Sequence, residues 1–459
     1  MRDYKECFKG KKITMLGLGL LGRGLNDAKF LAECGADLIV TDLKTADELK
    51  PTLKKLQSTK SNLQSTKFVL GEHRLEDFRN RDFILKSAGV PLGSPYIAEA
   101  KKNNIPIEMD ESLFFKLVSD VTLIGVTGTR GKTTTTYLIY EILKAAYGEK
   151  VHLGGNIRGL ATLPLLKKIR PGDMVVAELS SWQLQGFGEA KISPQISVFT
   201  NLLPDHLNYY LIGSKDEKEA KQKYFLDKAQ IFANQKAGDH LILDRDIKKI
   251  ILQRYSRNIL STQKIIGNRL PAGWKPKIKG EHNVRHILRA MEVAKILGVD
   301  LKIIKKAVEN FGGVDGRQQL VREYKGIKIY NDTTATTPDA TVVALKSLGD
   351  KKKKNLVLII GGSDKGLVMS VLIKEAPKYC KKIIVLDGIG SDKLKIQISK
   401  IKAWDYAEAS SLKEAVKKAV GYCKRGDTLL LSPAHASKGM FKNEYDRGDQ
   451  FVKIINDLK

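Results

Sequence analysis

Short apolar runs alternate along the chain with longer stretches in which apolar residues recur every three or four positions. The short runs include "MVVAEL", "ISVFTNL", "NLVLIIGG" and "KKIIVLDG", whose length and β-branched content predict buried strands. The longer stretches include "KQKYFLDKAQIFANQ" and "NVRHILRAMEVAKILGV", whose spacing predicts helices over 221–235 and 283–299. Strands that alternate with helices predict an α/β fold with mostly parallel sheets, in which ligands bind at the carboxyl ends of the strands.

The chain of 459 residues is too long for one hydrophobic core. The alternation of strand and helix restarts at "VTLIGVTG" and again after residue 313, without a repeat or a low-complexity linker. We therefore predict three α/β domains, over 1–119, 120–313 and 314–459, joined by short connections.

The formal net charge of +28 is a feature that many nucleic-acid-binding proteins share. Here, however, the lysines are scattered along every segment, and no stretch interleaves basic residues with several aromatics as a base-stacking surface would. We expect an enzyme with a lysine-rich surface that attracts anionic substrates, and no nucleic-acid partner.

Other features of composition bear on the compartment. No apolar run reaches the roughly 18 residues that a membrane helix needs, and the N-terminus lacks the pattern of a signal peptide. The four cysteines lie far apart without C-x-x-C spacing, which argues against a disulfide framework or a zinc site. We expect a cytoplasmic protein that does not insert into membranes.

A glycine-rich turn follows the first apolar run. Gly17, Gly19 and Gly22 form G-x-G-x-x-G between a predicted strand and a predicted helix, and Asp42 ends the next strand, "ADLIVTD". Such glycines let the backbone approach a diphosphate at a helix N-terminus, while the acidic residue binds a ribose. By itself the motif indicates a dinucleotide such as NAD.

A second glycine turn, "GVTGTRGKTTTT", nearly matches the phosphate loop G-x-x-x-x-G-K-[ST]. Gly131, Lys132 and Thr133 fit, but Val126 stands where the first glycine belongs. The apolar run before the turn and the helical pattern after it favour a phosphate loop over a glycine-threonine turn with a surface lysine. Lys132 would then neutralise phosphate oxygens, and the hydroxyl of Thr133 would hold Mg²⁺.

Two further residues follow apolar runs of the central segment. Glu178 ends "MVVAEL", where a carboxylate indicates a Mg²⁺ ligand, although an edge acid or a helix N-cap would give the same pattern. His206 in "NLLPDHLN" is a lone histidine, and a structural role is the more common one for such a residue.

Eleven segments in order along nearly the whole chain resemble the Mur ligases. The loop form G-T-x-G-K-[ST] after a strand is found in that family and in the related folylpolyglutamate synthetases, which accounts for Val126. The other segments that carry the resemblance are "LGLGLLGRG", "GGNIRG", "AELSSWQLQ", "TNLLPDHLN", "YFLDKAQIFANQ", "GEHNVRHILRA", "VDGRQQLV", "NDTTATTPDAT", "GGSDKG" and "LLLSPAHASKGMFKNEYDRGDQF". The two segments "ELSSWQLQ" and "SPAHAS…FKN…RGDQF" are most similar to the branch of the family that adds D-glutamate.

The resemblance implies a Rossmann-like N-terminal domain that binds UDP, a central P-loop ATPase-like domain and a Rossmann-like C-terminal domain that binds an amino acid. It implies ATP-dependent ligation of D-glutamate to UDP-N-acetylmuramoyl-L-alanine through an acyl phosphate, in peptidoglycan precursor synthesis. It further implies two Mg²⁺ ions and a monomer. The alternatives are a sibling ligase that uses L-glutamate or acts at another step, a dehydrogenase using NAD(P), and a nucleic-acid-binding protein.

The resemblance also assigns the residues of the ATP and metal sites. Lys228 would be N-carbamoylated and would join Thr133, Glu178 and His206 around the metal ions, with Lys221 and Lys223 as alternatives if the helix register differs. The implied catalytic residues are Lys132, Glu178, His206 and Lys228. The implied ATP contacts are Gly128, Thr129, Arg130, Gly131, Lys132, Thr133, Thr134, Asn283, Arg317 and Asp332.

The remaining assignments concern the other two substrates. For the UDP-sugar the resemblance points to Leu20, Leu21, Asp42, Ser87, Gly89, Asn156 and His206, and for glutamate to Thr336, Lys365 and Ser437. The sequence departs from the family pattern at three positions. Thr334 replaces a lysine, Glu444 replaces an aromatic residue, and His286 replaces the second asparagine after Asn283. The first two leave open whether D- or L-glutamate is used.

Overall fold

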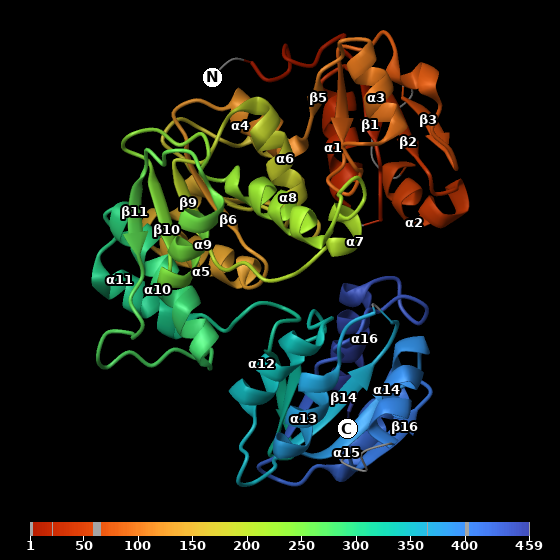
Figure 1. The fold of residues 1–459 in the computed structure, drawn as a ribbon, viewed down its shortest axis with the longest axis vertical. Coiled ribbons are helices and arrows are strands. Elements are labelled where there is room, and N and C mark those ends of the chain that lie inside the picture. The colour runs from red at the N-terminus through yellow and green to blue at the C-terminus, as the bar shows by residue number, and fades with distance from the viewer. Residues whose placement is uncertain (1–2, 21, 58–65, 365, 400–403, 459) are drawn as a thin grey trace. The chain divides into compact units, whose positions relative to one another are not determined.

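The computed structural model describes residues 3–20, 22–57, 66–364, 366–399 and 404–458, and it contains three sheets (Figure 1). The chain divides into two compact units. Unit 1 comprises Met1–Leu270 and His286–Ala307, and unit 2 comprises Pro271–Arg285 and Val308–Lys459. Unit 1 holds the first two sheets and unit 2 the third.

The first sheet has five parallel strands in the order β3-β2-β1-β4-β5. The order reverses between β1 and β4, so the glycine turn after β1 lies at the point where a doubly wound sheet binds its ligand. The strands are β1 Lys12–Leu16, β2 Asp37–Asp42, β3 Lys67–Leu70, β4 Phe83–Lys86 and β5 Ile107–Glu108, and the helices are α1 Arg23–Glu33, α2 Ala46–Gln57, α3 Pro95–Lys102 and α4 Asp110–Leu117.

The second sheet has six parallel strands in the order β11-β10-β9-β6-β8-β7. Because β6 lies between β8 and β9, the loops that follow these three strands meet at one edge. The strands are β6 Thr122–Thr127, β7 Val151–Gly155, β8 Met174–Glu178, β9 Ile196–Phe199, β10 His240–Leu243 and β11 Thr262–Ile265. The helices are α5 Lys132–Tyr147, α6 Ser181–Ala190, α7 Leu207–Tyr210, α8 Glu217–Ala229, α9 Arg245–Arg254, α10 Glu281–Ile296 and α11 Leu301–Asn310.

The third sheet also has six strands, in the order β12-β13-β17-β14-β15-β16, and only the β12–β13 pair is antiparallel. Along β14, Leu358 and Ile360 belong to one buried cluster and Val357 and Ile359 to another, so both faces of the sheet are covered. The strands are β12 Gln319–Tyr324, β13 Ile327–Asn331, β14 Leu356–Gly361, β15 Cys380–Leu386, β16 Tyr406–Ala409 and β17 Thr428–Leu431. The helices are α12 Pro338–Leu348, α13 Ser370–Tyr379, α14 Ile389–Ser399, α15 Leu412–Tyr422 and α16 Glu444–Asn456.

These sheets confirm the predicted α/β class with mostly parallel strands. The helix predicted over 221–235 is wrong at its end, because α8 stops at Ala229 and residues 230–234 form a turn. Ile231 and Phe232 continue the helical spacing of apolar residues, yet they belong to this turn, where their side chains are buried. The domain boundaries after residues 119 and 313 stay predictions.

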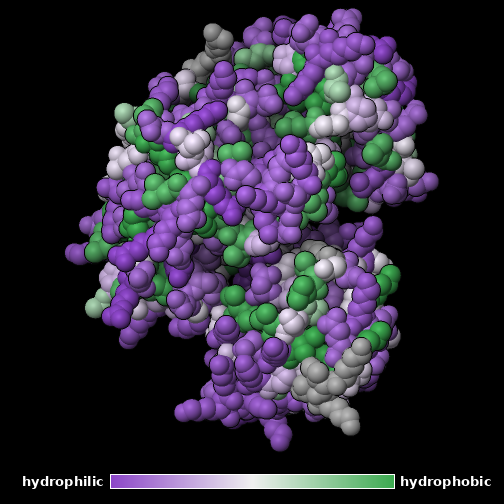
Figure 2. Space-filling model, in the orientation of Figure 1, coloured by the Kyte–Doolittle hydropathy of each residue, from purple (hydrophilic) through white to green (hydrophobic). Residues whose placement is uncertain are grey.

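The surface is largely hydrophilic on the face shown in Figure 2, in keeping with a charged fraction of 28%. Among the described residues, no helix combines the length and apolar character that crossing a membrane requires.

Candidate active site

The loop after β6 makes a tight turn around two glycines. Gly128 has φ 139° and Gly131 has φ 77°, which only glycine adopts readily. A Cβ atom on Gly128 would lie 2.0 Å from Oγ1 of Thr200, and one on Gly131 would lie 2.0 Å from Cε1 of His286. Val126, by contrast, is fully buried within β6, so the loop proper starts after it.

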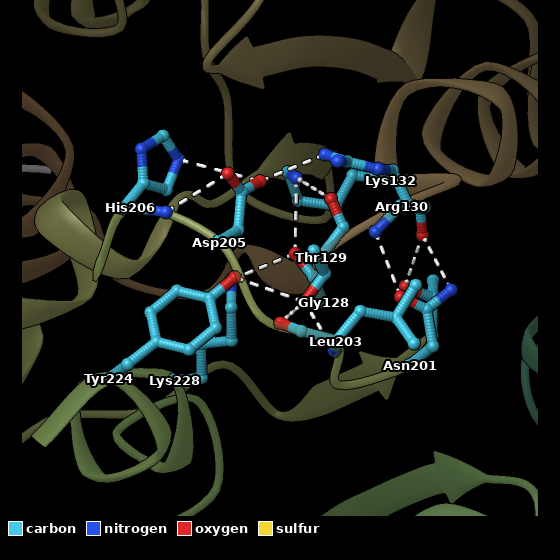
Figure 3. A network of polar contacts seen from close by, with 11 residues as sticks. Gly128, Thr129, Arg130, Lys132, Asn201, Leu203, Asp205, His206, Tyr224 and Lys228 are labelled. Carbon is cyan, nitrogen blue, oxygen red and sulfur yellow. Dashed lines mark hydrogen bonds and ion pairs between the residues drawn. The ribbon is translucent and has the colours of Figure 1, made fainter. Parts of the chain in front are cut away.

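Side chains from the loop after β9 and from α8 fix the conformation of this turn (Figure 3). The amide of Arg130 donates to Oδ1 of Asn201 at 2.8 Å, and the hydroxyl of Thr129 lies 3.0 Å from the hydroxyl of Tyr224. Thr200 donates from Oγ1 to the carbonyl of Arg130 at 2.7 Å. These contacts brace the loop at the N-terminus of α5, where backbone amides and the helix dipole favour an anion.

Lys132 and Thr133 begin α5 and lie against this turn. Nζ of Lys132 donates to the carbonyls of Gly128 at 3.1 Å and Thr129 at 3.0 Å. The hydroxyl of Thr133 donates to Oε2 of Glu178 at 2.6 Å. Glu178 is 2% exposed at the end of β8, so a carboxylate and a hydroxyl meet beside the loop.

Lys228 reaches the same turn from α8. It is 2% exposed, its Nζ donates to the carbonyl of Gly128 at 2.8 Å, and it lies 4.8 Å from the centre of the Tyr224 ring. Burial, and next the nearby charge of Lys132, hold the pKa of Lys228 well below its usual range. The alternatives Lys221 and Lys223 are only partly buried and pair with Glu217 and Glu219 of their own helix.

His206 is the N-cap of α7 and has φ 53°, a left-handed conformation. Its ring lies 4.6 Å from the Trp182 ring, and partial burial lowers its pKa, which favours the neutral imidazole. Nε2 of His206 lies 3.9 Å from Oδ2 of the neighbouring Asp205, and the same carboxylate pairs with Arg130 of the loop at 2.8 Å. Within the part of the chain that the structure describes, no group of three or more His, Cys, Asp or Glu could hold a metal ion by itself.

The glycine turn after β1 is closed by its own acidic residue. Oδ2 of Asp42 accepts from the amides of Leu18 and Gly19, both at 2.9 Å, and Oδ1 accepts from the amide of Lys44. Ser87 donates from Oγ to the carbonyl of Gly17 at 2.7 Å, which joins the turn to the loop after β4. The carboxylate of Asp42 therefore shapes this turn.

The other residues assigned to the UDP-sugar differ in their exposure and in their contacts. Leu20 and Gly89 are exposed, and Leu21 lies outside the described residues. Asn156, after β7, donates from Nδ2 to Oε1 of Glu178 at 3.1 Å, which places it beside the phosphate loop.

The remaining ATP assignments fall in unit 2. Asp332 is 6% exposed and accepts hydrogen bonds from Oγ of Ser432 at 2.8 Å and from the amide of Gln318 at 3.1 Å. Burial raises the pKa of Asp332 to about 7, although Arg317 lies near enough to oppose the shift. Asn283 is buried and donates to the carbonyl of Lys279 at 2.7 Å.

The residues assigned to glutamate also belong to unit 2. Ser437 is buried after β17 and Thr336 is half-buried after β13, while Lys365 lies outside the described residues. Thr334, which replaces the family lysine, donates from Oγ1 to the carbonyl of Gly316 at 2.9 Å. Glu444 begins α16, and its carbonyl accepts from the hydroxyl of Thr333 at 2.7 Å.

Several residues contact the candidate site although no sequence pattern assigns them a role. Asn201, Asp205 and Tyr224 contact the phosphate loop, and each falls in a segment that resembles the family. Asp205 precedes His206, so a carboxylate next to a candidate ligand histidine was a usable signal. Arg23, which contacts Asn156, follows the glycine turn directly, but its partner is too distant in sequence to be inferred.

Comparison with known proteins decides the family. The Mur ligase MurD-like N-terminal domain matches residues 11–108, the Mur ligase middle domain matches 126–306, and the Mur ligase glutamate ligase domain matches 316–435. A UDP-N-acetylmuramoylalanine–D-glutamate ligase from Roseiflexus sp. (strain RS-1) is 34% identical, over 97% of this chain and 98% of its own. The chain belongs to the Mur ligase family. The predicted resemblance is confirmed, and the chain is an ATP-dependent, amide-bond-forming ligase.

Solved structures show the same fold at lower identity. The UDP-N-acetylmuramate-alanine ligase from Thermotoga maritima is 18% identical with a TM-score of 0.61, covering 98% of this chain and 100% of that one. A MurF ligase from Thermotoga maritima in complex with ADP is 16% identical with a TM-score of 0.56, over 99% of this chain and 98% of that one. These similarities confirm a three-domain Mur ligase fold for the chain.

Proposed function

We propose that this Mur ligase joins D-glutamate to UDP-N-acetylmuramoyl-L-alanine and converts ATP to ADP and phosphate. The observation that carries the proposal is the full-length similarity, at 34% identity, to a ligase named for these two substrates. The braced loop with Lys132 and Thr133 supports the ATP half of the reaction.

The reaction requires two bond-forming steps. The free carboxylate of the UDP-sugar attacks the terminal phosphorus of ATP, which gives an acyl phosphate and ADP. The amine of D-glutamate then attacks the acyl carbon, loses a proton and expels phosphate. Lys132 and the loop amides would neutralise the transferred phosphoryl group, so positioning and charge compensation supply most of the catalysis. Asn283, Arg317 and Asp332 would bind the rest of the nucleotide.

The residues beside the loop fit a magnesium ion. Glu178 supplies a carboxylate and Thr133 a hydroxyl, both hard oxygen donors, and His206 presents an imidazole kept neutral by partial burial. When bound, Mg²⁺ would neutralise charge on the phosphates. A second Mg²⁺ would need another anionic donor, because the described residues contain no group of three or more His, Cys, Asp or Glu side chains that could hold a metal ion.

Lys228 fits the role of that donor as a carbamate. Its lowered pKa favours the neutral amine, whose nitrogen attacks CO₂ to form an N–C bond while one C=O π bond breaks to leave a carboxylate. The nitrogen then releases its proton to water. The product is an anion, so Lys132, which would repel an ammonium at this position, attracts the carbamate instead.

The other two substrates would bind around the remaining assigned residues. The turn braced by Asp42 and Ser87 would receive the UDP diphosphate, with Leu20, Leu21 and Gly89 beside it and Asn156 and His206 nearer the sugar. Thr336, Lys365 and Ser437 would hold glutamate. We expect a cytoplasmic monomer.

Phosphate release from ATP, with the product mass checked, tests the proposal. It is measured with UDP-N-acetylmuramoyl-L-alanine and D-glutamate, L-glutamate or no amino acid. We expect release and a glutamate-sized mass gain only with D-glutamate. Lys132→Ala should lower the rate by about 10²–10³-fold, while Lys144→Ala, on the exposed side of the same helix, should not. Release with L-glutamate alone, or with neither, would refute the substrate assignment.

A further inference from the structure

A continuous chain of hydrogen bonds links the first sheet of unit 1 to the phosphate loop on the second. It begins at Arg23, the first residue of α1, whose Nη2 donates to Oδ1 of Asn156 at 2.9 Å. Asn156 donates from Nδ2 to Oε1 of Glu178 at 3.1 Å. The other oxygen of Glu178 accepts from the hydroxyl of Thr133 at 2.6 Å. Four side chains, from α1, the segment after β7, the end of β8 and α5, are therefore connected in series.

The chemistry of the groups fixes the direction of this chain. A guanidinium can only donate and an ionised carboxylate can only accept. The amide of Asn156 therefore has to turn its oxygen to Arg23 and its NH₂ to Glu178. Without Arg23, the carboxylate of Glu178 would still select the NH₂ of the amide, but the amide oxygen would lose its donor and the side chain of Asn156 would be held at one end only.

Arg23 is itself firmly held. Its Nη1 lies 3.5 Å from Oε1 of Glu111, and its Nη2 also reaches the carbonyl of Gly155 at 3.3 Å. Glu111 is fully buried and accepts from Nε2 of Gln183. Burial acts to lower the pKa of Arg23, but Glu111, Asp110, Asp27 and Glu178 outweigh it and raise the pKa. The guanidinium therefore stays charged.

A second contact supports the link. Asn26, one turn further along α1, donates from Nδ2 to the carbonyl of Gly159 at 3.2 Å. The first turn of α1 thus holds the segment after β7 at two points, Gly155–Asn156 and Gly159. The same helix begins directly after the glycine turn, with Gly22 as its N-cap.

We propose that Arg23 is a positioning residue that orients Asn156 and, through it, the carboxylate of Glu178 for metal and nucleotide. The inference rests on the proposed function, in which Glu178 and Thr133 bind Mg²⁺ and the turn before Arg23 binds the UDP diphosphate. Through its guanidinium, whose planar fork binds two acceptors at once, Arg23 would couple the UDP-sugar turn to the metal site.

The test measures how strongly Mg²⁺ enhances ADP binding, by calorimetry on the full chain, together with the Mg²⁺ concentration that gives half-maximal phosphate release. We expect Arg23→Met and Arg23→Lys to weaken both by about 10- to 100-fold, the usual loss when a group that orients a metal ligand is removed. Arg81→Met is the matched control, because the side chain of Arg81, just before β4, is 8% exposed and donates to the carbonyls of Ile13 and Asp37.

Asn156→Ala provides a variant that leaves the buried charges untouched, since Asn156 is exposed. If Arg23 acts through Asn156, the Mg²⁺ dependence of the double variant Arg23→Met/Asn156→Ala should equal that of Asn156→Ala. Additive losses, an unchanged Mg²⁺ dependence in a folded Arg23 variant, or the same shift in Arg81→Met would overturn the proposal. The calorimetry uses neither amino acid nor UDP-sugar, so it decides the role of Arg23 even if the substrate assignment fails.

Discussion

The side-chain nitrogen of Lys228 lies 2.8 Å from the carbonyl oxygen of Gly128, so a lysine of α8 contacts the turn of the phosphate loop (Figure 3). A buried ammonium is repelled by Lys132, whereas a carbamate at this position is attracted by it. We predict that protein freed of CO₂ loses activity and that bicarbonate restores it. ¹³C-labelled bicarbonate should give one carbamate resonance that is absent from Lys228→Ala.

Two variants separate this role from the general effect of losing a lysine. Lys228→Ala should lower activity by about 100-fold, with or without bicarbonate. Lys221→Ala removes a partly exposed lysine of the same helix that pairs with Glu217, and it should retain activity and its response to bicarbonate. A Lys228→Ala protein that stays active and does not respond to bicarbonate would refute the carbamate assignment.

The variant form of the phosphate loop yields a second prediction. Gly128 shapes the loop, whereas Val126, at the consensus glycine position, belongs to the buried strand β6. Gly128→Ala places a Cβ atom on Thr200, and a displaced loop should cost about 100-fold in activity. Val126→Gly restores the consensus G-x-x-x-x-G-K-[ST] but removes a buried side chain from a strand. It should therefore destabilise the protein by about 2–4 kcal/mol without raising activity. Nucleotide affinity and urea unfolding of both variants provide the measurement, and higher ATP affinity in Val126→Gly would contradict it.

The sequence carried enough information for the central strands but not for the edges of the sheets. Strands such as β6, β8 and β14 are continuous apolar runs, because parallel strands are covered on both faces. The edge strand β11, Thr262–Ile265, is exposed along its whole length and has no apolar pattern. Its existence depends on pairing with β10, which no local signal reveals.

Residue roles show the same division. Helical spacing alone would have placed Lys228 on the buried face of α8, since it follows Ala220 and Tyr224 at intervals of one turn. The contact of Arg23 with Asn156 spans 133 positions, and the direction of an amide depends on all its partners. Such information is present only in the assembled fold.

A third prediction follows from Asp332. Burial raises its pKa to about 7, so between about pH 4 and pH 7 the folded state binds more protons than the unfolded state. The free energy of unfolding should therefore fall as pH rises through this range, by on the order of 2–4 kcal/mol. Asp332→Asn removes this dependence. In urea unfolding, the stability of the variant relative to the wild type should therefore increase from pH 5 to pH 8. Asp405→Asn, at an exposed acid, should follow the wild-type curve.

The ionisation of Asp332 should also appear in ATP binding. If the carboxylate accepts from the ribose, the KM for ATP should decrease as pH rises through about 7, because the charged form is the better acceptor. In Asp332→Asn the KM for ATP should be higher and nearly independent of pH over this range. A wild-type KM for ATP that stays constant from pH 6 to pH 8 would separate Asp332 from the nucleotide.

Arg447 of α16 is fully buried, and no acidic side chain forms an ion pair with it among the residues described for unit 2. Its Nε and Nη2 donate to Oγ1 and the carbonyl of Thr333, at 3.1 and 2.8 Å, and its Nη1 donates to the carbonyl of His435 at 3.3 Å. Burial lowers the pKa of Arg447 to about 10, so it is charged at neutral pH. A cation that forms no ion pair, but that lies near the charge of Glu444, thus joins the loops that carry Thr336 and Ser437.

We predict that this charge attracts the dicarboxylate substrate in place of the family lysine that Thr334 replaces. Arg447→Met should raise the KM for D-glutamate by about tenfold or more and leave the KM for ATP within about twofold. Arg447→Lys should recover much of the affinity, because it keeps the charge while losing part of the hydrogen bonding. The control is Arg322→Met, since Arg322 also donates to main-chain carbonyls, those of Ile455 and Asn456. Lower thermal stability in both methionine variants, with a changed KM for D-glutamate only in Arg447→Met, would separate the charge from the packing. Equal KM values for D-glutamate in the two would leave Arg447 as a purely structural brace.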